Sequence, residues 1–173
     1  AGIHSGDSMG VLPPQRLKPE TCLKIESLSE RLAEKLDTIG YLNLQLAVKN
    51  DQVYMLEANP RSSRSVPFMS KATLIPIVDL GVLAMLGYDK KKVKPENYKW
   101  RNASQVSVKG VVFPFKKFPE ADSLLGPEMK STGESMGRGA DYAEALLKAS
   151  LSSHIFLPTH GEIFLSLRDK DKE

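Results

Sequence analysis

Apolar residues recur at steps of three and four after Pro19, which predicts an amphipathic helix with one core-facing stripe. The members of this stripe are Cys22, Ile25, Leu28, Leu32, Leu36 and Ile39. Gly40 is the expected end of the helix, because glycine readily adopts the left-handed conformation that ends many helices. Cys22 is in phase with the stripe, so we interpret it as a small buried hydrophobe.

Apolar and polar residues alternate over residues 41–48, with leucines on one face and Asn43 and Gln45 on the other. A period of two is typical of a half-buried strand. Polar turn residues then separate this run from a second apolar run over residues 53–58, and Asn59-Pro60 ends it. The two runs together predict a β-hairpin.

The remaining pattern mixes helices and strands and predicts an α+β protein with an antiparallel sheet and flanking helices. The further elements expected are irregular structure with one strand over 1–19, a polar loop with a short apolar patch over 61–76, a buried helix over 77–86, an exposed lysine-rich linker over 89–98, a strand over 104–115, a loop over 116–139, a helix over 141–151 and a last strand over 163–167.

Composition narrows the class of protein. The 173 residues carry 24 basic and 21 acidic side chains, and a net charge of +3 is too small to indicate a nucleic-acid or anionic membrane partner. No apolar run approaches the roughly 20 residues of a membrane-spanning helix, and no secretory pattern opens the chain. We therefore expect a cytoplasmic protein, or one of an organelle matrix. Both ends look cut, so we expect a piece of a longer protein.

The hairpin turn decides which polar side chains face one another, since a shift of one residue exchanges the two faces of a strand. A two-residue turn would set Glu57 opposite Leu44. A three-residue turn would set Glu57 opposite Gln45 and Asn59 opposite Asn43. This second register places an amide, a carboxylate and a second amide on one face, with cross-strand partners about 5 Å apart at Cβ.

Oxygen ligands of this kind suit a hard cation, Mg²⁺ or Mn²⁺, that also holds substrate phosphates. A single carboxylate with amides makes a poor protein cage, so the phosphate oxygens of a nucleotide would have to complete the shell. The alternative, slightly favoured by spacing alone, is that Gln45 and Asn59 only form hydrogen bonds on a solvated sheet face. Arg61 and Arg64 follow, and guanidinium groups bind phosphate or carboxylate in bidentate fashion. Ordinary surface salt bridges are the alternative for them.

Four longer stretches resemble the carbamoyl-phosphate synthase large-subunit family. They are HSGDS at 4–8, LNLQLAV at 42–48, LEANPRSSRSVPFMSKAT at 56–73 and LLGPEMKSTGE at 124–134. They follow the family's order over nearly the whole chain. The resemblance implies the second ATP-grasp half of that subunit, which phosphorylates carbamate to carbamoyl phosphate for pyrimidine and arginine biosynthesis. It further implies the C-terminal part of an ATP-grasp domain over 1–88, a small α/β connecting segment over 89–153, and the first strand of a methylglyoxal synthase-like allosteric domain over 154–173.

The resemblance also assigns roles to residues and partners. It implies nucleotide contacts for Gly2, Ile3, His4 and Ser5, metal ligation by Gln45, Glu57 and Asn59, ATP-phosphate contacts for Gln45 and Glu57, and carbamate or phosphate binding by Arg61 and Arg64. The implied cofactors are ATP and Mg²⁺ or Mn²⁺, with K⁺ as a further candidate. The implied partners are carbamate, the rest of the large subunit, and a glutaminase small subunit or fused glutaminase domain.

The family covers its nucleotide with a glycine-rich subdomain that has no counterpart upstream of Gly2, so we expect the chain alone to be inactive. Two other interpretations stay open. One is a different ATP-grasp carboxylate ligase, such as a biotin carboxylase or a purine-pathway enzyme. The other is a non-catalytic regulatory or interaction module. For His4 the alternative to a nucleotide contact is an ordinary surface or structural role.

Overall fold

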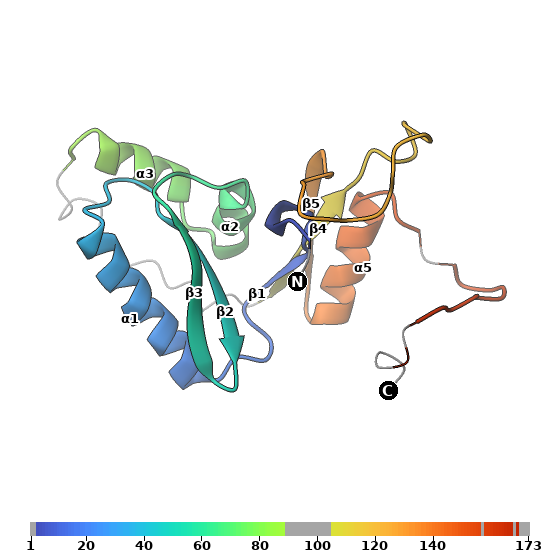
Figure 1. Ribbon diagram of the computed structural model, residues 1–173, viewed down its shortest axis with the longest axis horizontal. Coiled ribbons are helices and arrows are strands. Elements are labelled where there is room, and N and C mark those ends of the chain that lie inside the picture. Colours follow the sequence, from blue (N-terminus) through green and yellow to red (C-terminus); the bar gives the residue numbers. More distant parts are fainter. Residues whose placement is uncertain (1–2, 89–104, 157, 168, 170–173) are drawn as a thin grey trace.

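The computed structural model describes residues 3–88, 105–156, 158–167 and 169 (Figure 1). Gly2 and the predicted lysine-rich linker over 89–98 lie outside these residues. The described elements are η1 (Ser5–Asp7), β1 (Gly10–Leu12), α1 (Pro19–Lys35), β2 (Asn43–Lys49), β3 (Gln52–Asn59), α2 (Val66–Thr73), α3 (Ile77–Met85), β4 (Val106–Val112), β5 (Gly133–Gly139) and α5 (Tyr142–Ser152). The α+β class predicted from the sequence is confirmed.

One sheet has the antiparallel order β1-β4-β5, and α5 packs against it (Figure 1). The core between sheet and helix contains Val108, Ala145 and Ala149, whose side chains are at most 1% exposed. β1 belongs to the first predicted segment, 1–88, whereas β4 and β5 belong to the second. The predicted domain boundary at residue 88 therefore separates β1 from the other two strands of its own sheet. The boundary stays a prediction.

β5 corrects the loop predicted over residues 116–139. It pairs with β4 along its whole length, from Val106 opposite Gly139 to Val112 opposite Gly133. The sequence gives no strand signal there, because glycine is depleted in strands and three of the seven residues are glycine. The packing explains the composition. A Cβ added at Gly137 would lie 2.0 Å from the carbonyl oxygen of Ala145 on α5.

The second sheet is the predicted hairpin, β2 with β3, and α1 packs beside it (Figure 1). α1 ends at Lys35, five residues before the expected end at Gly40. The first four members of its apolar stripe, Cys22 included, are half-buried, and the last two are exposed because they follow the helix end. Gly40 adopts a positive φ of 96° in the turn that leads into the hairpin.

α2 corrects the polar loop predicted over residues 61–76. Pro67 lies in the first turn of this helix, where its missing N–H has no cost. Phe68 and Ala72 are one helical turn apart and pack with Leu12 in a second small core. The helix stops where Leu74 becomes left-handed. Proline followed by apolar residues at positions i and i+4 was the sequence signal for it.

α3 confirms the helix predicted over 77–86, but it is less buried than expected. Val78, Val82 and Met85 are all more than 40% exposed, and only Gly81 is buried among its residues. Among the described helices none is by itself long and apolar enough to cross a membrane. Only α2 and α3 taken together reach that length and apolar character, and a 118° bend separates them.

The strand predicted over 163–167 is wrong in this structure, since residues 162–167 form no strand. A strand requires hydrogen bonds to a neighbouring strand, and this stretch runs away from the α5 layer (Figure 1). Ile163, Phe164 and Leu165 are 78%, 94% and 72% exposed.

Candidate functional site

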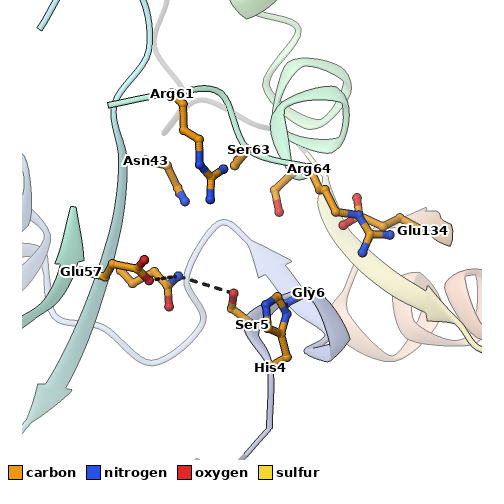
Figure 2. A pocket seen from close by; sticks show the side chains of 11 residues that line it. His4, Ser5, Gly6, Asn43, Glu57, Arg61, Ser63, Arg64 and Glu134 are labelled. Carbon is orange, nitrogen blue, oxygen red and sulfur yellow. Dashed lines mark hydrogen bonds between the residues drawn. The ribbon is translucent and has the colours of Figure 1, made fainter. Parts of the chain in front are cut away.

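A polar cavity of about 260 Å³ lies where the N-terminal turn, the hairpin and the loop before α2 meet (Figure 2). Its volume is below the roughly 300–1,000 Å³ of pockets that enclose a whole small molecule, so it suits one end of a larger ligand. The lining residues are His4, Ser5, Gly6, Asn43, Gln45, Glu57, Arg61, Ser63, Arg64, Ser65 and Glu134.

The hairpin register places the polar face of both strands at this cavity. Gln45 pairs with Glu57 and Asn43 with Asn59, as the second of the two predicted registers requires. The predicted reason for that register is wrong, because the turn contains only two residues, Asn50 and Asp51, and both have positive φ. A two-residue turn of this kind matches the natural twist of a hairpin.

A β-bulge changes the register between the turn and the site. Leu46 pairs with Met55 while Gln45 pairs with Glu57, so Leu56 is the extra residue on β3. A bulge adds one residue to one strand and turns the following side chains to the other face. Without it the two-residue turn would set Glu57 opposite Leu44, on the apolar face.

Gln45 and Glu57 form the centre of the predicted metal site. The Gln45 amide nitrogen donates to Glu57 Oε2 at 2.8 Å and faces the Ser5 hydroxyl at 3.5 Å. These contacts hold both side chains toward the cavity, where their oxygens fit a hard cation. In the part of the chain that the structure describes, no three His, Cys, Asp or Glu residues gather in a way that could hold a metal ion. A cation here would therefore need further oxygens from its substrate.

Asn59 is the predicted metal ligand that does not line the cavity. It lies opposite Asn43 on the same face of the hairpin, and its amide nitrogen is buried with no hydrogen-bond partner among the described residues. Such a buried orphan donor normally finds a partner. Its role as a metal ligand stays a prediction.

Arg61 and Arg64 both reach the cavity from the loop that follows β3 (Figure 2). Arg61 donates to the carbonyl of Ser62 at 3.0 Å, and Arg64 donates to the Ser131 hydroxyl at 3.2 Å. Among the described residues neither guanidinium forms an ion pair. Within the described part of the chain no ordinary salt bridge occupies either arginine, and such an unpaired guanidinium group can bind an anionic ligand.

The N-terminal turn supplies the opposite wall. His4 Nδ1 accepts a hydrogen bond from the Gly6 amide at 2.9 Å, which caps the short helix η1 and orients the ring. His4 and Ser5 line the cavity, whereas Ile3 does not line it and is 39% exposed. The nucleotide contacts of these residues stay a prediction. Gly2 lies outside the described residues.

Five lining residues were not among the predicted site residues: Gly6, Asn43, Ser63, Ser65 and Glu134. Asn43 lies two residues before Gln45, so strand alternation already put it on the right face. Glu134 comes from β5, which the sequence did not predict as a strand. It forms an ion pair with Lys109 Nζ at 3.4 Å, and the Lys109 side chain is only 7% exposed. Burial of a charge requires such a partner.

Comparisons with known proteins agree on a family. Residues 1–92 match the family model described as carbamoyl-phosphate synthase L chain, ATP binding domain. The whole chain is 47% identical to a carbamoyl phosphate synthase large chain from Methanosphaerula palustris, of which it spans 16%. It is 46% identical to the C-terminal section of such a large chain from Methanocaldococcus jannaschii, of which it spans 29%.

Solved structures show the same fold at low sequence identity. An ADP complex of N5-carboxyaminoimidazole ribonucleotide synthetase superposes with a TM-score of 0.62 at 17% identity, over 89% of this chain and 43% of that one. The Thermotoga maritima enzyme of the same name gives 0.60 at 14% identity, over 85% of this chain and 44% of that one. These neighbours are ATP-grasp enzymes, so the fold is of the ATP-grasp kind.

Proposed function

Because the chain belongs to the family of carbamoyl-phosphate synthase L-chain ATP-binding domains, we propose that it forms part of a site that phosphorylates carbamate. The reaction transfers the γ-phosphoryl group of ATP to a carbamate oxygen and gives carbamoyl phosphate and ADP. The observation that carries the proposal is the convergence of Gln45, Glu57, Arg61 and Arg64 on one small polar cavity. The chain spans 16% of the Methanosphaerula palustris large chain, so we attribute the activity to a large chain that contains it.

In this proposal Glu57 and Gln45 would hold a divalent cation, Mg²⁺ or Mn²⁺, with the phosphates of the nucleotide as further ligands. Their geometry supports the assignment, because the bulge turns Glu57 to the cavity. The amide nitrogen of Gln45 lies 2.8 Å from Glu57 Oε2. Asn59 on the same face is the third ligand. When bound, such a cation neutralises charge that develops on the transferred group.

Arg61 and Arg64 bind the oxygens of carbamate and of the transferring phosphoryl group. Phosphoryl transfer requires little covalent chemistry from the protein, so catalysis depends on placing donor and acceptor in line and on offsetting negative charge. Two guanidinium groups without ion-pair partners among the described residues supply that charge. His4 and Ser5 contact the nucleotide from the opposite wall, and the sequence resemblance extends this contact to Gly2 and Ile3.

We further propose the finer organisation that the sequence resemblance implies. Residues 154–173 begin a methylglyoxal synthase-like allosteric domain, and the exposure of Ile163, Phe164 and Leu165 supports a packing partner for this stretch. A glutaminase subunit or domain supplies the ammonia. K⁺ is a cofactor in addition to the divalent cation, and the enzyme is cytoplasmic. A different ATP-grasp ligase is not favoured, since the relatives at 46–47% identity are carbamoyl phosphate synthases.

The test is a single substitution in a full-length large chain that carries this sequence. Glu57→Gln removes the charge and keeps the shape, so it should lower carbamoyl phosphate synthesis from carbamate by about a hundredfold or more. ATP synthesis from ADP and carbamoyl phosphate, the reverse reaction, should fall by the same factor. Bicarbonate-dependent ATP hydrolysis, which the resemblance places in the other half, should be retained.

Glu30→Gln, an exposed change on α1, is the matched control and should leave both activities unaltered. Equal loss of both partial reactions in Glu57→Gln would assign this site to the other half of the enzyme. Full retention of carbamate phosphorylation would show that Glu57 holds no catalytic cation.

A further inference from the structure

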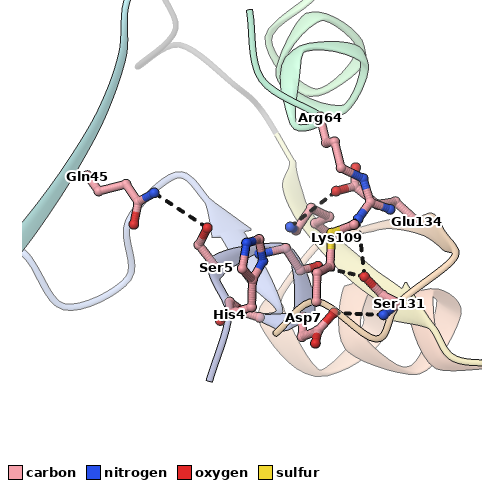
Figure 3. Close-up of polar contacts among 11 residues, drawn as sticks. His4, Ser5, Asp7, Gln45, Arg64, Lys109, Ser131 and Glu134 are labelled. Atoms are coloured by element: carbon pink, nitrogen blue, oxygen red, sulfur yellow. Dashed lines mark hydrogen bonds and ion pairs between the residues drawn. The ribbon is translucent and has the colours of Figure 1, made fainter. Parts of the chain in front are cut away.

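Asp7 is a buried charge next to the proposed site that the proposed mechanism does not use. Its side chain is 4% exposed, and it lies on η1 directly after the turn that lines the cavity. Among the described residues, neither carboxylate oxygen of Asp7 forms an ion pair with a basic side chain. Instead the carboxylate reaches across to a loop more than 120 residues further along the chain (Figure 3).

The two oxygens of Asp7 accept two backbone hydrogen bonds from that loop. Oδ2 accepts from the amide of Lys130 and Oδ1 from the amide of Ser131, each at 2.9 Å. Burial raises the pKa of Asp7, but the hydrogen bonds from Lys130 and Ser131 and the nearby His4 together outweigh it and hold the pKa below its ordinary value. A carboxylate suits this role because it is an acceptor at both oxygens, whereas an amide would offer one acceptor only.

The loop held by Asp7 also holds Arg64. Ser131 is 5% exposed, and its hydroxyl donates to the carbonyl of Gly6 at 3.2 Å while it accepts from Arg64 Nη1 at 3.2 Å (Figure 3). The hydroxyl therefore has its proton directed to Gly6 and a lone pair directed to the guanidinium. Arg64 also contacts the sulfur of Met129 in the same loop.

The neighbours of Gly6 show how closely the N-terminal turn, the loop and Arg64 approach one another. A Cβ added at Gly6 would lie 2.8 Å from the Met129 sulfur and 3.3 Å from Arg64 Nη1. The N-terminal turn, the loop and the arginine are thus in contact as one unit. Displacement of the loop would move the group to which Arg64 is hydrogen-bonded.

We propose that Asp7 is a positioning residue for Arg64, acting through the backbone of Lys130 and Ser131 and the hydroxyl of Ser131. The inference rests on the proposed function, in which Arg64 binds the transferring phosphoryl group or its acceptor. Asp7 touches no substrate. It fixes the position of Arg64, one of the two arginines that line the cavity. Because Asp7 lies on η1, it also fixes the turn that contains His4.

The experiment is a double-mutant cycle in the full-length large chain, read as kcat and KM for carbamate phosphorylation. Asp7→Asn should lower kcat by about tenfold or more, since a displacement of about 1 Å at a reacting group can cost a hundredfold. The KM for ATP should change by less than about threefold, because an interaction made mainly in the transition state acts on kcat. In an Arg64→Ala background the same substitution should change kcat by less than about twofold.

Asp141→Asn is the matched control. Asp141 also accepts a backbone hydrogen bond, from Glu144 at 2.9 Å, but it is exposed and caps α5. It should leave kcat unaltered. If Asp7→Asn does not fold, Ser131→Ala takes its place in the cycle, with the same expected results, because it removes only the hydroxyl between Arg64 and Gly6.

Three results would overturn the inference or its basis, and they differ from one another. Unaltered kcat in a folded Asp7→Asn or Ser131→Ala chain, with activity lost in Arg64→Ala, shows that Arg64 needs no such support. An equal penalty with and without Arg64 shows that Asp7 acts on the fold in general. Full activity of both Arg64→Ala and Glu57→Gln contradicts the proposed function itself.

Discussion

Gly137 lies where β5 crosses α5, and a methyl group added there has no room. An alanine Cβ would lie 2.0 Å from the Ala145 carbonyl oxygen and 2.3 Å from the Ala149 amide nitrogen. Ordinary contact begins at about 3.4 Å, so α5 would have to move away from the sheet by about 1.4 Å. Both obstacles are backbone atoms of a helix, which cannot rotate aside as a side chain would.

The magnitude follows from what that displacement separates. Ala145 and Ala149 are fully buried against Val108, and a gap of even 0.5–1 Å forfeits about a quarter to a half of each dispersion contact. Overpacking of a core costs about 1–3 kcal/mol. We expect Gly137→Ala to lower the free energy of opening this layer by about 3 kcal/mol, at the upper end, because the whole helix must move.

Native-state hydrogen exchange in β4, β5 and α5 measures this opening locally in a large chain. A loss of 3 kcal/mol corresponds to exchange about a hundredfold faster, since 1.4 kcal/mol is about tenfold. Gly133→Ala on the same strand is the control, because its Cβ would meet Val112 at an ordinary 3.5 Å. Exchange rates that agree within about threefold between the two variants would refute the packing argument.

Two further predictions concern the carboxylates of Asp141 and Asp7. Asp141 accepts from the Glu144 amide at 2.9 Å as the N-cap of α5, so Asp141→Ala should cost about 1 kcal/mol and accelerate exchange in the first turn, whereas Asp141→Asn should not. The pKa of Asp7 in the folded chain is below its ordinary value of 3.8, so the charged carboxylate stabilises the fold fully at pH values above 3.8. This stabilisation is lost as the pH falls further, through the folded-state pKa. The stability difference between the native chain and Asp7→Asn should therefore be constant from pH 7 to about 5 and shrink below 3.8; a difference that grows in acid would contradict the assignment.

Local pattern was sufficient wherever an element's own residues decide its conformation. The hairpin strands and the helices after Pro19, Pro76 and Asp141 follow from periodicity and from proline, aspartate and glycine at their ends. The polar face of the hairpin was visible too, because strand alternation groups Asn43 and Gln45 without any knowledge of the partner. The family resemblance then assigned roles to Glu57, Arg61 and Arg64, which the structure brings to one cavity with Gln45.

Packing between distant segments decided what the pattern could not. β5 reads as loop from its glycines, yet β4 provides its hydrogen bonds and α5 requires the missing side chains. α2 is a helix in a stretch read as polar loop because Phe68 and Ala72 pack with Leu12, far away in sequence. The predicted strand over 163–167 failed for the converse reason, since an apolar run without a paired neighbour forms no ladder.

The site shows the same division within a few residues. The sequence alone determined which side chains are chemically able to hold a cation or a phosphate, since that depends on residue type and strand period. Only the tertiary structure decided that a bulge at Leu56, rather than a three-residue turn, brings Glu57 opposite Gln45. It also decided that Asp7 holds the loop that holds Arg64, because hydrogen bonds across more than 120 residues leave no trace in local spacing.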